Sequence, residues 1–131
     1  AIAGGPTPYG AGSWNNAEVD QWYRACSAGG TRKRPYGNDY VAKACNVGAD
    51  GGALLAAGGS PECVGGFPGL FDMVGNATEW TSSCATSTGP DDDCVIRESW
   101  YESAASEDCT STGVRPRSGK HQARGFRCCT E

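Results

Sequence analysis

Hydrophobic side chains are concentrated in a few short segments of this chain, and long polar and glycine-rich stretches separate them. The first segment, residues 16–26, carries apolar side chains at helical spacing and is predicted to form an amphipathic helix. Asn15 or Asn16 is expected to cap its N-terminus, and Gly29 and Gly30 to end it. The apolar positions of this helix are Val19, Trp22, Tyr23 and Cys26.

Residues 69–80 hold the strongest apolar cluster of the chain and are predicted to be core. In their middle, Asn76 and Glu79 lie three residues apart beside Gly75, whose freedom at positive φ lets the backbone bend. Amide, carboxylate and main-chain oxygens are ligands that suit calcium. Spacing alone nevertheless favours a turn asparagine followed by a solvated glutamate over a metal site. The apolar members of the segment are Leu70, Phe71, Met73, Val74 and Trp80.

The remaining apolar segments predict short strands joined by irregular chain. Residues 94–97 and 99–101 are expected to form a strand with aromatic pairing, and residues 124–129 a short final strand that ends in adjacent cysteines. Residues 1–13 are expected to be an irregular lead-in, and residues 41–66 a long irregular excursion. A loop of that length in a small domain is usually functional or held by cross-links.

A length of 131 residues fits a single domain that spans residues 1–131, and 20 glycines with 7 prolines predict a loop-rich one. Eight cysteines indicate disulfides and an oxidising compartment rather than zinc, because the chain has no C-x-x-C pair and one histidine. Cys84 and Cys94 bracket a polar loop and are expected to form a local disulfide. Cys45 and Cys63 are available to cross-link the irregular excursion.

The formal net charge of −4 disfavours a general nucleic-acid binder. Acidic residues dominate residues 79–108 and basic residues dominate 115–127, so we expect the two groups to neutralise each other rather than to form a basic binding patch. The basic run 32–34 and the acidic run 91–93 are expected to face solvent. No segment is long and apolar enough to span a membrane, and the chain opens at Ala1 without a signal sequence.

No catalytic constellation follows from residue types and spacing. His121 is the only histidine and lies in a polar loop, where a lone histidine is more often incidental than catalytic. No serine stands in a G-x-S-x-G setting, and no glycine pair has the full pattern of a phosphate-binding loop. Glu98 and Glu102 are not distinguished from surface acids.

Five segments that follow one another in a fixed order carry a family resemblance. They are Ala25-Cys26-Ser27-Ala28-Gly29-Gly30, Pro35-Tyr36-Gly37-Asn38, Cys45-Asn46-Val47, the stretch from Gly69 to Ser82, and Arg124-Gly125-Phe126-Arg127-Cys128. In this order the chain resembles the formylglycine-generating enzyme (sulfatase-modifying factor) family from about Val19 to Cys128. The central G-N-x-x-E-W-T and the final G-F-R are its most specific parts. The resemblance implies an α+β, C-type-lectin-like fold of the formylglycine-generating-enzyme type, loop-rich and disulfide-stabilised.

The resemblance also implies calcium as a cofactor and reverses the preference stated above. One family site maps to the side chains of Asn76 and Glu79, with main-chain carbonyls near Val74, Gly75 and Ala77. A second site, whose spacing is shorter here than in the enzymes, maps to Asn46, Val47, Asp50 and Gly52. Composition alone favours a turn over a cation site at that second position.

The family disulfide implied by the resemblance joins Cys26 to Cys109, and we add Cys84–Cys94 and Cys45–Cys63 on proximity. Cys128 or Cys129 would then face a partner cysteine in an N-terminal portion of the family domain that this chain lacks.

The departures from the family concern the catalytic residues. The enzymes bind copper through a cysteine pair that oxidises a substrate cysteine, but residues 97–106, which align with that segment, contain no cysteine. Copper(I) needs two thiolates, so the site cannot form. Related iron enzymes use a histidine triad, which one histidine cannot supply.

We therefore expect a secreted (extracellular or periplasmic), calcium-stabilised, non-catalytic binding or structural module that recognises a protein or glycan surface. Trp100 and Tyr101 are the predicted contacts. The first alternative is a copper-dependent oxidase acting on a cysteine-bearing peptide. The second is a structural subunit completed by another polypeptide that supplies the missing N-terminal part.

Overall fold

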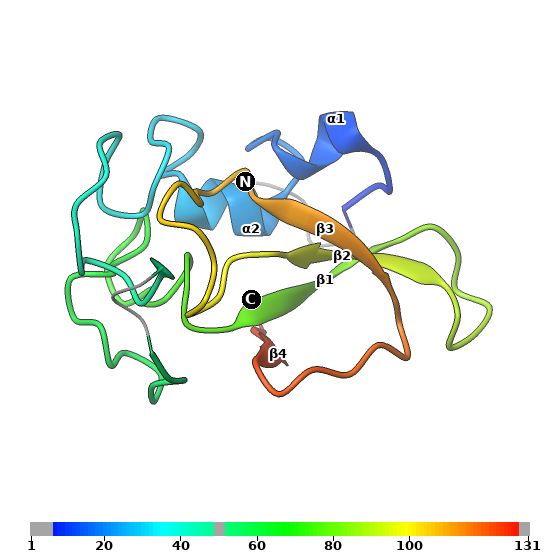
Figure 1. Ribbon diagram of the computed structural model, residues 1–131. Helices are drawn as coiled ribbons and strands as arrows, with labels where there is room; N and C mark the ends of the chain where they lie inside the picture. Colours follow the sequence, from blue (N-terminus) through cyan, green and yellow to red (C-terminus); the bar gives the residue numbers. More distant parts are fainter. Residues whose placement is uncertain (1–6, 49–51, 129–131) are drawn as a thin grey trace.

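The computed structural model describes residues 7–48 and 52–128. Figure 1 shows two parts, a small twisted sheet and, beside it, a region of irregular loops drawn in cyan and green. Regular structure is sparse, and the fold is α+β and loop-rich, as predicted. The elements are α1 (Ala11–Trp14), α2 (Gln21–Cys26), β1 (Thr78–Cys84), β2 (Asp93–Arg97), β3 (Thr112–Pro116) and β4 (Arg124–Phe126).

The four strands form one sheet in the order β3-β2-β1-β4. β2 pairs antiparallel with both β1 and β3, while β4 runs parallel to β1, with Thr78 opposite Arg124. A register irregularity in β1 separates the Trp80↔Ile96 pair from the Cys84↔Cys94 pair. β2 is one of the two inner strands and buries four consecutive residues, which explains its apolar run.

Strand predictions succeed where apolar residues dominate and fail elsewhere. The prediction over 94–97 is confirmed by β2, and the final strand is present but ends at Phe126, before the cysteines. The prediction of a strand over 99–101 is wrong, because Trp100 N–H donates to Ser103 Oγ (2.9 Å) and Ser103 N–H donates to the Trp100 carbonyl (2.9 Å), which turns the chain. β1 and β3 were not predicted, because their threonine, serine, arginine and proline residues do not give the alternation of apolar and polar positions that is typical of a strand.

The predicted helix over 16–26 is too long at its start. α2 begins at Gln21, and its cap is Asp20, whose Oδ1 accepts from Tyr23 N–H at 2.5 Å, rather than Asn15 or Asn16. Val19 lies before the helix and is exposed. The predicted end is correct: Gly29 N–H donates to the Arg24 carbonyl at 2.9 Å, with Gly29 and Gly30 at positive φ.

The short helix α1 replaces part of the irregular lead-in that was expected over residues 1–13. It begins at Ala11, and Ser13 N–H donates to the Gly10 carbonyl at 2.9 Å. Among the residues that the structure describes, no helix is long and apolar enough to cross a membrane.

Three disulfides support a small hydrophobic core, and they are the same three pairs that the sequence led us to expect. Their members are separated by 83, 18 and 10 residues along the chain, in the pairs Cys26–Cys109, Cys45–Cys63 and Cys84–Cys94. The first two lie inside the core cluster, beside Val47, Met73 and Val74. Such cross-links compensate for a core that short apolar segments fill only in part. Cys128 is exposed and forms no disulfide with any described residue, and Cys129 lies outside the described residues.

The central segment is core only in part. Met73 and Val74 are buried, but Phe71 is exposed. At its end Gly75 takes φ +83°, and a Cβ there would lie 2.5 Å from the Asn46 carbonyl oxygen, so only glycine allows this approach of the two loops. The bend predicted at Gly75 is therefore present, and it brings residues 44–47 against the start of β1.

Candidate functional site

Asn76 is buried at the bend and connects two loops through its side-chain amide. Its Oδ1 accepts from Leu55 N–H (2.8 Å) and from Asn46 Nδ2 (3.0 Å), and its Nδ2 donates to the Leu55 carbonyl (3.1 Å). Asn46 Nδ2 also donates to the Ala53 carbonyl at 2.9 Å. These bonds satisfy the backbone of residues 53–55, which belongs to no strand, and hold that loop on the core.

Glu79, three residues further on, faces different partners. Its Oε2 accepts from Trp22 Nε1 at 2.7 Å and from Arg127 Nε at 2.6 Å, while Oε1 pairs with Arg127 Nη2. The guanidinium of Arg127 thus binds the carboxylate through two nitrogens, and it also donates to the Phe71 carbonyl. Glu79 therefore joins α2, β1 and the segment after β4.

A second ion pair, which is fully buried, contacts the face of the Trp22 indole. Arg97 Nη2 is 2.7 Å from Asp20 Oδ1, both side chains are only 2% exposed, and the guanidinium carbon is 4.5 Å from the centre of a Trp22 ring. Arg97 also donates to the Trp14 carbonyl at 2.7 Å. Burial lowers the pKa of Arg97, and the Asp20 carboxylate opposes that shift.

These contacts do not fit a calcium ion held by Glu79. Both carboxylate oxygens already accept from donors, and the positive charge beside them is the Arg127 guanidinium. The Asn76 Oδ1 accepts from two donors, and the Asn76 carbonyl accepts from Tyr101 N–H at 3.2 Å. A calcium centre needs six to eight oxygens aimed at one point. The carbonyls of Val74, Gly75 and Ala77, the other predicted ligands, flank the bend.

The second predicted calcium position is only partly described. Asn46 and Val47 are buried, and the Asn46 amide is engaged by Asn76 and Ala53. Gly52 is exposed and takes φ +128°. Asp50 lies outside the described residues, so the only predicted carboxylate ligand of that site is not placed.

Residues 99–103, part of the segment that the family resemblance led us to compare with the catalytic residues of the enzymes, make structural contacts here. Ser99 Oγ accepts from Gly75 N–H at 2.9 Å, which braces the bend of the central motif. Tyr101 is 8% exposed, so its predicted role as a ligand contact does not fit its buried position. Trp100 is partly exposed and lies edge-on to Tyr101, with ring centroids 5.0 Å apart.

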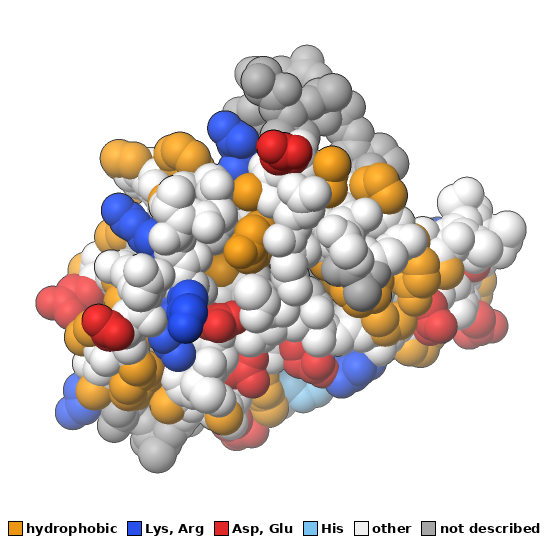
Figure 2. All heavy atoms as spheres, turned by 90° about the horizontal axis from the view of Figure 1, so that it is seen from above, with side chains coloured by type: hydrophobic (Ala, Val, Ile, Leu, Met, Phe, Trp, Pro, Cys, Tyr) orange, Lys and Arg blue, Asp and Glu red, His pale blue; other side chains and the backbone are white. Residues whose placement is uncertain are grey.

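The acidic and basic halves of the sheet region neutralise each other in part, as the charge pattern predicted, while Lys120 and Arg124 form no ion pair with a described acidic side chain. Residues from the acidic stretch pair with residues from the basic stretch, and Figure 2 shows the two signs interspersed over the face it displays. Each of these pairs joins segments distant in sequence, so the sequence pattern could not give their partners. The pairs are Glu79–Arg127, Asp92–Arg117 and Glu98–Arg115.

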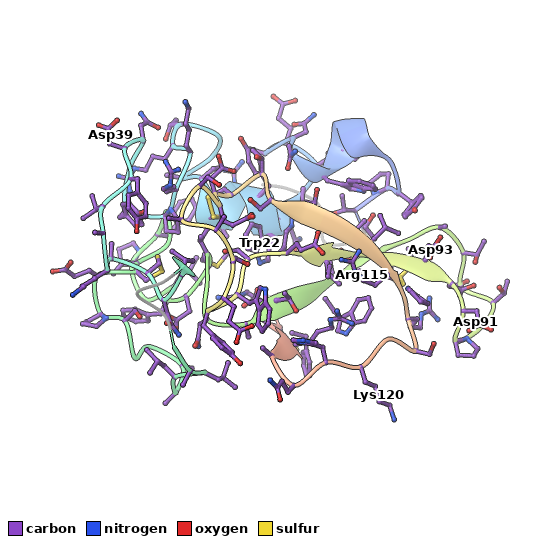
Figure 3. All side chains as sticks on the ribbon, in the orientation of Figure 1. Trp22, Asp39, Asp91, Asp93, Arg115 and Lys120 are labelled. Atoms are coloured by element: carbon purple, nitrogen blue, oxygen red, sulfur yellow. A yellow bond between two sulfur atoms is a disulfide. The ribbon has the colours of Figure 1, made fainter. Side chains whose placement is uncertain are left out.

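The acidic run 91–93 divides between solvent and interior. Asp91 and Asp93 are exposed, as expected, and Figure 3 shows them at the end of the β1–β2 hairpin. Asp92 is buried, and its carboxylate accepts from Thr88 N–H at 2.8 Å and from Gly89 N–H at 2.9 Å. These bonds, led by the one from Gly89, hold the pKa of Asp92 well below its usual range.

A groove with apolar walls opens where the central segment passes β4. Its volume is about 600 Å³, and we call it the Phe126 groove after its most exposed wall residue. Phe126 is 74% exposed, and three further large apolar side chains of the groove are exposed as well. Sequence reasoning missed this groove, because its walls come from three segments that no periodicity connects. The four side chains are Leu54, Leu55, Phe71 and Phe126.

Comparisons with known proteins agree with the fold. Residues 17–131 match a family described as the sulfatase-modifying factor enzyme 1-like domain. A similar solved structure is the crystal structure of CarF, with a TM-score of 0.58 and 16% sequence identity, covering 88% of this chain. The match spans 43% of the CarF chain, so this chain corresponds to less than half of that protein. No curated protein matches this sequence.

Proposed function

Because the chain belongs to the family of sulfatase-modifying factor enzyme 1-like domains, we propose that it is a non-catalytic, extracellular member that binds an extended apolar segment of another polypeptide. Three disulfides favour an oxidising compartment. Residues 97–106 contain no cysteine, and Ser99 and Tyr101 of that segment support the bend at Gly75 and Asn76. Binding rather than oxidation is the chemistry that these residues support.

The Phe126 groove is the observation that carries this proposal. Four large apolar side chains are exposed together around one hollow, and contiguous apolar patches of this kind mark interaction sites on soluble proteins. The charged groups at its floor, Glu79 and Arg127, already neutralise each other. An apolar occupant therefore leaves no buried charge unpaired.

The sheet supplies a reason for an extended occupant. β4 lies at one edge of the sheet as the structure describes it, and its residues Gly125 and Phe126 line the groove. An edge strand offers unpaired backbone groups to an incoming strand, and the groove then takes alternate side chains of that strand. This matches the alternative raised from the sequence, a module completed by a second polypeptide.

A titration with a model peptide tests the proposal. The peptide acetyl-Lys-Val-Thr-Val-Thr-Val-Lys-amide is added to ¹⁵N-labelled protein, and amide shifts are followed by NMR. We expect saturable shifts at Gly125, Phe126 and the Leu54–Leu55 loop. A control peptide with serine in place of valine is expected to produce none.

Matched variants locate the binding surface. Leu54 and Val41 are 50% and 49% exposed, and only Leu54 lines the groove. Leu54→Asp should abolish the peptide-induced shifts, whereas Val41→Asp should leave them unchanged. Equal effects of the two variants, or shifts that map away from β4, would exclude the groove as the binding site.

Calcium is not required by this proposal. The hypothesis of a calcium-stabilised module stays a prediction from the family resemblance, and the contacts of Glu79 with Arg127 and Trp22 argue against it.

A further inference from the structure

A second hollow lies between β4 and the loop that follows β3, and its lining is cationic and aromatic. Its volume is about 310 Å³, and none of its lining residues belongs to the Phe126 groove. We propose that this hollow binds the anionic group of an acidic saccharide. Its charged and aromatic lining residues are Trp80, Arg117, Lys120, His121 and Arg124.

The charge balance of the region leaves two cations available. Arg115 pairs with Glu98, and Arg117 Nη2 lies 3.3 Å from Asp92 Oδ2. Within residues 7–48 and 52–128, neither Lys120 nor Arg124 forms an ion pair with an acidic side chain. Lys120 belongs to the loop between β3 and β4 and lines the hollow, and Figure 3 shows its side chain pointing outward from that loop. An anion at this place would meet positive charge that, at Arg124, the carboxylate of Glu98 offsets only in part.

Arg124 is held in place and keeps an unused donor. Its guanidinium carbon lies 5.1 Å from the centre of a Trp80 ring, and Nη1 donates to the Gly119 carbonyl at 3.0 Å. Its Nε is buried and has no hydrogen-bond partner among the described residues. Burial, together with the nearby Arg115, lowers the pKa of Arg124. A bound oxyanion would favour the charged guanidinium, because it offsets the repulsion from Arg115.

The aromatic residues favour a saccharide over a bare inorganic anion. Trp80 lines the hollow, and His121 at its rim lies edge-on to Trp100 with ring centroids 4.8 Å apart. Trp100 was expected to contact a ligand, and this geometry puts it behind His121 rather than at the hollow itself. Aromatic faces pack against the C–H faces of sugar rings, while guanidinium and ammonium groups bind carboxylate or sulfate. A volume of about 310 Å³ is at the small end of ligand pockets, which suits one sugar unit.

An NMR titration of the ¹⁵N-labelled protein with monosaccharides tests the site. The probes are glucuronate, galactose 6-sulfate, glucose and inorganic sulfate. Saturable shifts at the Trp80 indole N–H and at Gly119 with either acidic sugar, and none with glucose, support the proposal, and the tighter acid identifies carboxylate or sulfate as the preferred group. No shifts with either acid, or inorganic sulfate binding as tightly as both, overturns it.

Two lysine variants separate the site from general charge attraction. Lys120 and Lys33 are both exposed, but only Lys120 lines the hollow. Lys120→Gln should weaken binding of the acidic sugar about tenfold, the effect expected for loss of one charge-assisted contact, and Lys33→Gln should not change it. Equal weakening by both variants would mean non-specific attraction and would reject the site.

Arg124→Gln should abolish binding of the acidic sugar, while the Val-Thr peptide still shifts the amides of Gly125 and Phe126. This proposal and the proposed function therefore fail independently.

Discussion

The loop region (residues 44–77) and the sheet region (residues 78–128) satisfy their buried polar groups by different means. In the loop region two neutral amides do so for the backbone of residues 53–55, since Asn46 and Asn76 bond to each other and to that segment, and one carboxylate, Asp72, accepts from Gly58 N–H at 2.6 Å. In the sheet region charges do so, since the covered carboxylates of Glu79 and Asp92 pair with Arg127 and Arg117, and a third pair, Glu98–Arg115, lies at the surface. Asn76 and Glu79 lie three residues apart and belong to different systems.

This difference explains why one motif does not make one site. A loop without strand partners must bond its N–H and C=O groups to side chains, and an asparagine amide offers both a donor and an acceptor. A carboxylate only accepts, so Glu79 is satisfied by the donors Trp22 and Arg127. Asn76 and Glu79 therefore have two different structural roles, although they lie three residues apart in one motif.

The largest expected effect comes from the disulfide that ties α2 to the segment before β3. Cys26→Ser with Cys109→Ser opens a loop of 83 residues and should lower the free energy of unfolding by about 4 kcal/mol in urea titrations. Cys84→Ser with Cys94→Ser opens 10 residues and should cost about 2.7 kcal/mol. An equal loss in the two double variants would contradict the ordering by loop length.

Next in size is the buried ion pair beside Trp22. Asp20→Asn leaves the Arg97 charge buried without its counter-ion, and the stability loss should be about 3 kcal/mol, measured by urea unfolding. Glu18→Gln, an exposed acid two residues away, is the matched control and should change stability by less than about 0.5 kcal/mol. If both variants unfold at the same urea concentration, the pair does not support the fold.

A smaller loss is expected in the loop region. Asn76→Asp keeps the shape of the side chain but removes the Nδ2 donor, whose one partner is the Leu55 carbonyl. The free energy of unfolding should therefore fall by about 2 kcal/mol. The same variant tests the calcium hypothesis, because an added carboxylate would strengthen a calcium site. Stabilisation of Asn76→Asp by millimolar calcium would therefore restore that hypothesis.

The pH dependence of the hairpin between β1 and β2 should be modest. Because folding lowers the pKa of Asp92, the ionised carboxylate stabilises the fold above the pKa of the unfolded chain, and this is lost as pH falls through the lower folded pKa. Asp92→Asn should thus flatten the stability profile below about pH 4. Thermal unfolding between pH 2 and 7 measures it, with the exposed Asp91→Asn as control. An unchanged profile for Asp92→Asn would show that the hairpin bonds do not depend on its charge.

The smallest effect is expected from chelation. If Arg127 neutralises Glu79 as its contacts indicate, excess EDTA should leave the melting temperature unchanged, and Glu79→Gln should lower it with or without calcium. A clear fall of the melting temperature on chelation, reversed by added calcium, would instead support ligation at Asn76 and Glu79.

Local sequence patterns predicted those elements whose own residues show an apolar run or a terminating glycine pair. The buried strand β2 follows from an unbroken apolar run, and the end of α2 from a glycine pair that accepts positive φ. The start of α2 was misplaced, because Asn15, Asn16 and Asp20 are all good caps and only the packing of Asp20 against Arg97 selects one of them. β1 and β3 escaped prediction because their burial depends on neighbours rather than on apolar alternation.

The amino-acid sequence by itself determined the family, the α+β loop-rich class, the three cross-linked pairs and the overall charge neutralisation. The fold class and the two short-range cysteine pairs follow from residue types and spacing, and the family with the Cys26–Cys109 pair follows from the family resemblance, so none of them needs knowledge of the neighbours in space. Only the tertiary structure decided that Arg127 meets Glu79, that Tyr101 is buried and that Leu54, Phe71 and Phe126 share a groove. Hydrogen-bond partners and exposure depend on how segments that are distant in sequence pack together. In this chain irregular loops connect most of those segments, and such loops carry no periodic pattern from which their packing could be predicted.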